Sequence, residues 1–87
     1  MPTAPFTYDD LGEIMVDRLG LAPDEIPVDP DTAFTDVGLD SLAVVEIQSA
    51  IQQRYGFRIP DEDAGTMTTL RETVDYVNER LGAAEVL

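Results

Sequence analysis

An arginine followed two residues later by a glycine occurs three times in this 87-residue chain. The three pairs are Arg18 and Gly20, Arg54 and Gly56, and Arg80 and Gly82. Each pair follows a segment whose apolar residues recur at helical spacing. The helix dipole favours a cation in the last turn, and glycine adopts the left-handed conformation that commonly ends a helix. The repeated pattern therefore predicts three helices that end at these pairs, with the arginines in structural roles.

Start signals place the beginnings of the same three helices. Thr7 suits the N-cap of the first helix, and the second begins at Asp40 or Ser41. The third begins at Thr69, because Thr69 and Glu72 have the spacing of a capping box. No segment alternates between apolar and polar residues as a half-buried strand would. The chain is therefore predicted to be all-α.

The segments between the helices complete the expected fold. The connection from Leu21 to Leu39 is long and needs anchors in the core, for which Ile26, Val28 and Phe34 are the candidates. A short helical turn is expected over residues 59–65, where a proline suits the first helical position and acids suit the first turn. The prediction is a small bundle of three main helices plus one short helix, with a long loop between helices one and two.

Length and composition narrow the class of protein. Eighty-seven residues fit a single domain over 1–87, with an ordered core at about 7–82 and loose tails at 1–5 and 83–87. The chain has no cysteine or histidine, so it lacks disulfides and the usual zinc ligands, and no metal site is expected. It shows neither a basic leader nor a long apolar run, so a cytoplasmic protein that neither enters nor binds a membrane is expected.

Charge indicates the kind of partner. Eighteen acidic residues against five arginines give a net charge of −13, which repels nucleic acid and anionic membranes and favours basic docking surfaces. The acids are densest before Ser41, since residues 1–40 carry a net charge of −9 and residues 41–87 a net charge of −4. Most of them solvate the surface. The acids beside Ser41 are the ones for which a role is predicted.

Ser41 is the residue at which chemistry is expected. It lies where a helix begins, and unpaired amide groups and the helix dipole stabilise an anion such as phosphate there. The chain has no histidine, cysteine or lysine to activate a serine, so no catalytic residue is expected and Ser41 is predicted to be modified by another protein. Serine and aspartate are also common N-caps, and spacing alone leaves both interpretations open. Asp40 would repel a phosphate, so it is expected to cap the helix, to contact a cationic partner, or both.

The second helix carries apolar residues on two different faces. Steps of 100° per residue place four residues on one arc, which is the predicted core face: Val44, Ile47, Ile51 and Tyr55. Leu42 and Val45 fall elsewhere, beside Glu46, and the same bundle cannot bury both groups. Apolar side chains next to Ser41 and surrounded by acids suit a docking surface better than a core.

The segment Gly38-Leu39-Asp40-Ser41-Leu42, with the helix that follows, closely resembles the attachment motif of acyl carrier proteins. The resemblance continues through Phe34–Val37, Tyr55–Glu62 and Thr69–Leu81, and covers roughly residues 7–82. It implies an acyl-carrier-like bundle in which Ser41 is the attachment site of 4'-phosphopantetheine, donated by coenzyme A. It also implies that the thiol of this arm holds acyl groups as thioesters and presents them to enzymes in turn.

The resemblance also implies partners. The recognition surface would comprise six residues: Asp40, Leu42, Val45, Glu46, Glu62 and Asp63. The expected partners are a phosphopantetheinyl transferase that uses coenzyme A and magnesium, a ketosynthase, an acyltransferase and tailoring enzymes, all with basic docking surfaces. The chain itself would be a monomeric carrier subunit of a multi-enzyme synthase and not an enzyme.

The segments Ser41–Glu46 and Ile59–Gly65 look most like those of discrete carriers of type II polyketide synthases. Fatty-acid carriers usually keep more acids along the second helix, where this chain has Gln48, Gln52, Gln53 and Arg54. Fatty-acid and peptidyl carriers remain alternatives, and an acidic helical adaptor without a cofactor is the alternative of another class. A serine hydrolase is excluded because a base and the second glycine of a nucleophile elbow are missing.

Overall fold

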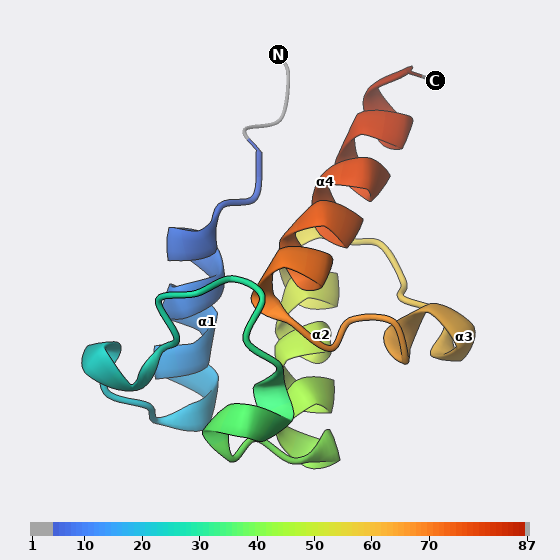
Figure 1. The fold of residues 1–87 in the computed structure, drawn as a ribbon. Coiled ribbons are helices and arrows are strands. Elements are labelled where there is room, and N and C mark those ends of the chain that lie inside the picture. The colour runs from blue at the N-terminus through green and yellow to red at the C-terminus, as the bar shows by residue number, and fades with distance from the viewer. Residues whose placement is uncertain (1–4, 87) are drawn as a thin grey trace.

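The computed structural model describes the backbone of residues 5–86 and the side chains of residues 5–82. Its elements follow in this order: α1 (Tyr8–Leu19), the 3-10 turns η1 (Pro23–Glu25) and η2 (Phe34–Val37), α2 (Ser41–Tyr55), α3 (Asp61–Ala64) and α4 (Leu70–Val86). α1 contacts both α2 and α4, and α3 lies on the side of the bundle away from α1 (Figure 1). The predicted all-α fold of three main helices and one short helix is confirmed.

The three long helices bury one continuous core. Its largest fully buried residues within the helices are Leu11 and Met15 of α1, Ile47 and Ile51 of α2, and Val77 of α4. Val44 and Tyr55 are half-buried and pack against this core. The core face predicted for the second helix is therefore confirmed.

The ends of α1 and α2 follow local signals. Thr7 Oγ1 accepts a hydrogen bond from Asp10 N, and the Asp10 carboxylate accepts one from Thr7 N, each at 3.1 Å, so the first turn of α1 carries a capping box. The bond from the Thr7 backbone lowers the pKa of Asp10. Gly20 and Gly56 follow the last helical residues with φ of 70° and 76°, a conformation that costs glycine little.

The predicted end of the last helix is wrong. α4 continues through Gly82 to Val86, and Gly82 does not adopt positive φ. Two alanines and a glutamate follow Gly82, and these strong helix formers extend the helix past it. Arg80 is thus not in the last turn; its guanidinium lies 5.2 Å from the centre of the Phe57 ring. The expected tail at 83–87 is helical as far as Val86, while Met1–Ala4 and Leu87 lie outside the described residues.

Two other helix starts differ in detail from expectation. Thr69 caps α4 by accepting a hydrogen bond from Glu72 N at 3.0 Å, as predicted, but the Glu72 carboxylate reaches back to Thr68 N (3.2 Å) and not to Thr69. The hydroxyl of Thr68 also donates to this carboxylate, and that bond lowers the pKa of Glu72. Pro60 is the N-cap of α3, one position before the predicted one.

The loop between α1 and α2 is held at two of its three predicted anchors. Phe34 is buried, and its N–H donates to the Thr68 carbonyl at 2.9 Å, which joins the loop to the segment before α4. Ile26 is half-buried and packs against the core. Val28 is 99% exposed, so its prediction as an anchor was wrong. The chain enters a turn at Asp29 directly after Val28, and this turn runs over the surface.

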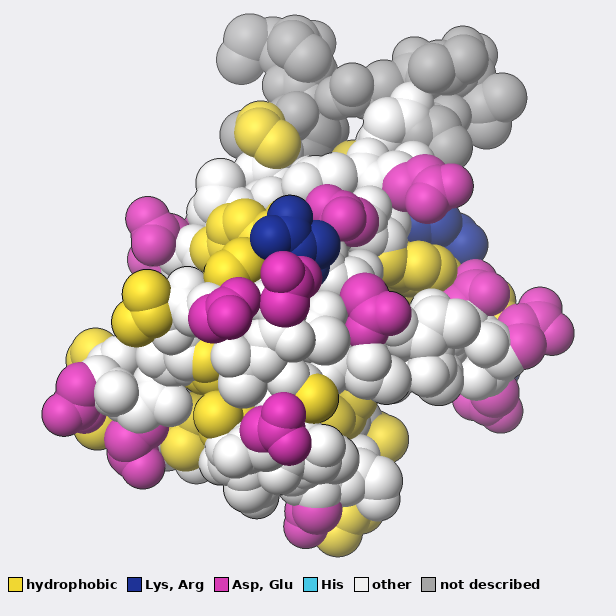
Figure 2. Space-filling model, in the orientation of Figure 1, with side chains coloured by type: hydrophobic (Ala, Val, Ile, Leu, Met, Phe, Trp, Pro, Cys, Tyr) yellow, Lys and Arg dark blue, Asp and Glu magenta, His cyan; other side chains and the backbone are white. Residues whose placement is uncertain are grey.

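None of the described helices is long and apolar enough to cross a membrane. Acidic side chains are spread over the face shown in Figure 2, while basic ones appear in few places. The distribution agrees with the net charge of −13.

Candidate functional site

Ser41 is the first residue of α2, and its side chain is exposed. Gly38, at φ 83°, ends η2, and Asp40 is extended, so the chain turns sharply from η2 into α2. Leu39 between them is buried and fastens this connection to the core. The alternation of flexible, apolar and capping residues therefore presents the serine at the surface, at the start of a helix.

Asp40 caps α2. Its Oδ1 accepts a hydrogen bond from Ala43 N at 2.9 Å, and its carbonyl accepts one from Val44 N at 3.1 Å. Within the part of the chain that the structure describes, the N–H groups of Ser41 and Leu42 have no partner. An anion on Ser41 Oγ would thus lie beside two unused donors and the positive end of the helix dipole.

A groove of about 460 Å³ begins at Ser41. Phe34 and Leu39 line it from the loop, Val44 from α2, and Met67 from the segment that leads into α4. Most of its surface is apolar, so it suits a flexible, largely apolar chain tethered at the serine.

Three glutamines of α2 were expected only to replace surface charge, and each instead binds a segment outside α2. Gln48 Nε2 donates to the Ala64 carbonyl at 3.1 Å, at the end of α3. Gln52 Oε1 accepts from Ile59 N at 2.7 Å, and Gln53 Oε1 accepts from Arg18 Nη2 at 2.7 Å.

The position of Gln48 could have been inferred from the sequence. Its direction on the helix is only about 40° from that of Val44, at the edge of the core face. The structure buries this residue, which is 8% exposed. A polar residue so close to the core arc needs a hydrogen-bond partner, and helical spacing alone could not have named that partner.

Three of the six predicted recognition residues have exposed side chains that form no hydrogen bond or ion pair with the described residues. Leu42 and Val45 are 77% and 57% exposed, which confirms that both lie off the core. Val45 also lines the groove at Ser41. Glu62 is exposed in the first turn of α3.

The other three already have partners within the chain. Asp40 caps α2, as described above. The Glu46 carboxylate lies 3.3 Å from Arg18 Nη1, so it links α2 to α1. Asp63 accepts a hydrogen bond from the Tyr76 hydroxyl at 2.8 Å. Burial and this bond both raise the pKa of Tyr76.

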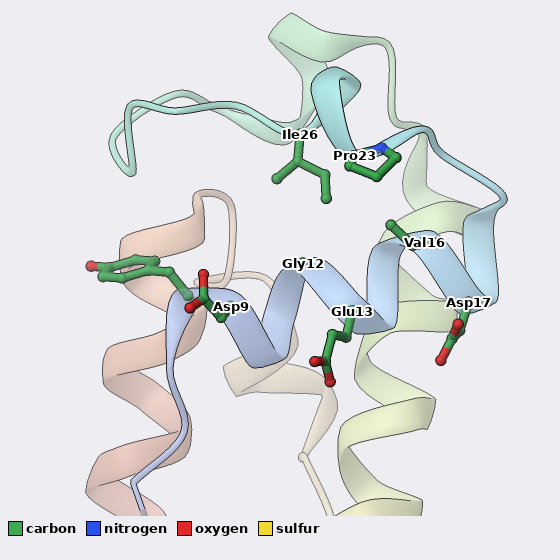
Figure 3. A pocket seen from close by; sticks show the side chains of 8 residues that line it. Asp9, Gly12, Glu13, Val16, Asp17, Pro23 and Ile26 are labelled. Atoms are coloured by element: carbon green, nitrogen blue, oxygen red, sulfur yellow. The ribbon is translucent and has the colours of Figure 1, made fainter.

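A second hollow, of about 540 Å³, lies between α1 and η1 and shares no residue with the groove at Ser41. Figure 3 shows its acidic side along α1 and, opposite, Pro23 and Ile26 projecting toward the helix. Gly12 permits this packing, because a Cβ there would lie 3.3 Å from Ile26 Cδ1. The hollow contains no serine, so the groove at Ser41 is the candidate site.

Comparisons with known proteins show the family to which the chain is similar. The model of the family described as "Phosphopantetheine attachment site" matches residues 9–77. The chain is 43% identical over 84 residues to an anthracycline acyl carrier protein from Streptomyces sp. (strain C5), covering 93% of this chain and 98% of the relative. It is 39% identical over 90 residues to a monensin polyketide synthase acyl carrier protein from Streptomyces virginiae, covering 99% of each. The solution structure of the octanoyl acyl carrier protein from the actinorhodin polyketide synthase in Streptomyces coelicolor superposes with a TM-score of 0.81 at 39% identity, covering 97% of this chain and 99% of that one.

Proposed function

This chain belongs to the phosphopantetheine attachment family, as an acyl carrier protein of the type II polyketide synthase kind, and from that premise we propose that Ser41 carries the 4'-phosphopantetheine arm. When bound, this group supplies the thiol that holds acyl groups as thioesters and that a cysteine-free chain lacks. The protein is a carrier subunit of a synthase and not a catalyst. We assign residues 1–87 to a single carrier domain. The cytoplasm, where coenzyme A is available, is its proposed location.

One observation carries the assignment of Ser41: it is exposed at the start of α2, at the mouth of an apolar groove and beside two N–H groups that have no partner among the described residues. These amides would hold the phosphodiester, and the groove would hold the arm or its cargo. We propose that the base that accepts the Ser41 proton comes from the transferase, because this chain has no histidine or lysine and the Asp40 carboxylate caps α2.

The wild-type protein tests the proposal. Incubated with a promiscuous phosphopantetheinyl transferase, coenzyme A and magnesium, it should gain the mass of one phosphopantetheine, read by intact-protein mass spectrometry. Fragmentation should place the added mass on the peptide that contains Ser41. An unchanged intact mass would contradict the proposal and favour an acidic adaptor without a cofactor.

We propose that partner enzymes read the surface that surrounds Ser41. Leu42 and Val45 supply exposed apolar contacts, and Glu62 supplies charge. Asp40 and Glu46 would add charge from positions where they also bind within the chain. Asp63 completes the proposed set. The proposed partners are the transferase, a ketosynthase, an acyltransferase and tailoring enzymes, each offering basic side chains to this acidic rim.

Leu42→Ala should slow transfer of the arm about fivefold or more at limiting protein concentration, with little change in the circular dichroism signal at 222 nm. The side chain is 77% exposed, so truncation removes partner contact and leaves the core intact. Val28→Ala is the control. It truncates an exposed apolar residue in the α1–α2 loop, away from Ser41, and should leave the transfer rate unchanged. Equal rates for Leu42→Ala and wild type would remove Leu42 from the docking surface.

A further inference from the structure

The groove at Ser41 contains one buried polar side chain, that of Gln48. Among the described residues only Gln48 and Thr73 are both polar and buried, and Thr73 is satisfied by the Thr69 carbonyl, away from this groove. The other buried side chains that line the groove are apolar, among them those of Phe34, Leu39 and Met67. A primary amide in that position is therefore the feature that distinguishes this groove from a plain apolar one.

Gln48 uses one of its amide hydrogens well and the other only weakly. An NH₂ group has two hydrogens to donate. One goes to the Ala64 carbonyl at 3.1 Å, and the only other acceptor within reach among the described residues is Met67 Sδ at 4.0 Å. A thioether sulfur at this distance is a weak acceptor. A carbonyl oxygen entering the groove beside Met67 would be a much better partner for the second hydrogen.

We propose that Gln48 is a recognition residue that donates a hydrogen bond to a carbonyl oxygen of the tethered chain. The inference rests on the proposed attachment at Ser41. Gln48 lies seven residues beyond Ser41, two helical turns or about 10 Å along α2, and both line the same groove. The ligand class is an oxygen-bearing chain: a β-oxo acyl group, or an amide carbonyl of the arm itself. Beyond its thioester carbonyl, a saturated acyl chain offers no acceptor to this donor.

Gln52 is the control that distinguishes recognition of the tethered chain from a purely structural role. It lies one turn further along α2 and also joins α2 to the segment leading into α3, through Ile59 N at 2.7 Å. It does not line the groove at Ser41. If glutamines on this helix only braced the fold, Gln48 and Gln52 would respond alike to whatever is tethered at Ser41.

Nuclear magnetic resonance of the wild-type protein tests the proposal in four forms: apo, with the arm alone, octanoyl-loaded and 3,5-dioxohexyl-loaded, each verified by intact mass. The side-chain amide signals of Gln48 should shift in the dioxohexyl form relative to the octanoyl form, while those of Gln52 stay in place. A shift already present with the arm alone would identify the arm as the source of the carbonyl. Gln48 signals that are the same in all loaded and unloaded forms would overturn the proposal. A protein that gains no mass would instead contradict the attachment at Ser41.

Hydrolysis rates of the two thioesters give a second readout. Gln48→Leu should speed hydrolysis of the dioxohexyl thioester relative to the octanoyl thioester by about three- to tenfold, the range of one neutral hydrogen bond. Gln52→Leu should leave that ratio unchanged. If the arm supplies the carbonyl, Gln48→Leu should speed hydrolysis of both thioesters equally, and Gln52→Leu should speed neither. Equal effects of the two substitutions would mean that Gln48 only braces α3, and would overturn the proposal.

Discussion

Ser41→Ala is expected to take up no phosphopantetheine at all, under conditions in which the wild-type protein is fully converted. Removal of Oγ removes the only atom to which the proposed phosphodiester is attached. The fold should persist, because the capping hydrogen bond to Ala43 N comes from the side chain of Asp40 and not from that of Ser41. Intact mass after incubation with the transferase and coenzyme A measures the effect, and circular dichroism verifies the helices.

Ser49→Ala is the matched control, because Ser41 and Ser49 are the two serines of the chain. Ser49 lies within α2, where backbone N–H groups are paired, and is only half exposed. Its removal should leave the mass gain unchanged. Retention of the added mass in Ser41→Ala, or its loss in Ser49→Ala, would refute the assignment.

Phe34→Ala is expected to lower the free energy of unfolding by about 3 to 5 kcal/mol. The ring is 2% exposed and lines the groove at Ser41, and the residue's N–H and carbonyl bind Thr68 and Leu39. Truncation would open a cavity at the point where the α1–α2 loop meets the segment before α4. Small domains are stable by only about 5 to 15 kcal/mol, so the loss is a large fraction of the total. Urea unfolding followed at 222 nm measures it.

Val28→Ala provides the control within the same loop. Its side chain is 99% exposed, so truncation should change the free energy of unfolding by no more than about 0.5 kcal/mol. The pair thus compares two apolar residues that the sequence presents as equivalent anchors. Equal shifts of the two urea midpoints would show that Phe34 does not hold the loop.

The segment from Gly38 to Leu42 owes its geometry to interactions within a few residues. Asp40 reaches Ala43 N three residues away, and Gly38 ends η2 by its own conformation. Such contacts depend on short segments of sequence, and for this reason the start of α2 and the exposure of Leu42 and Val45 were predictable. The same reasoning located the core face of α2, because helical periodicity is also a local property.

Contacts between distant segments were not predictable in this way. Glu46 was expected to face partners, yet Arg18, 28 residues earlier, forms an ion pair with it. Gln48 finds its acceptor 16 residues later, at the end of α3. Long side chains can reach several neighbours, and which one they meet depends on how the helices pack and not on the spacing along one of them.

Local signals in the chain thus specify three helices, their N-caps, and a serine exposed at the start of the second. Those signals act within about one helical turn, and they are strong enough to decide the conformation before the helices pack. Tertiary packing decides the rest. It buries Phe34 but leaves Val28 in solvent, and it closes an apolar groove beside Ser41 with the amide of Gln48 inside it. A groove exists only where separate segments meet, so its shape and its polar group depend on contacts that no single segment encodes.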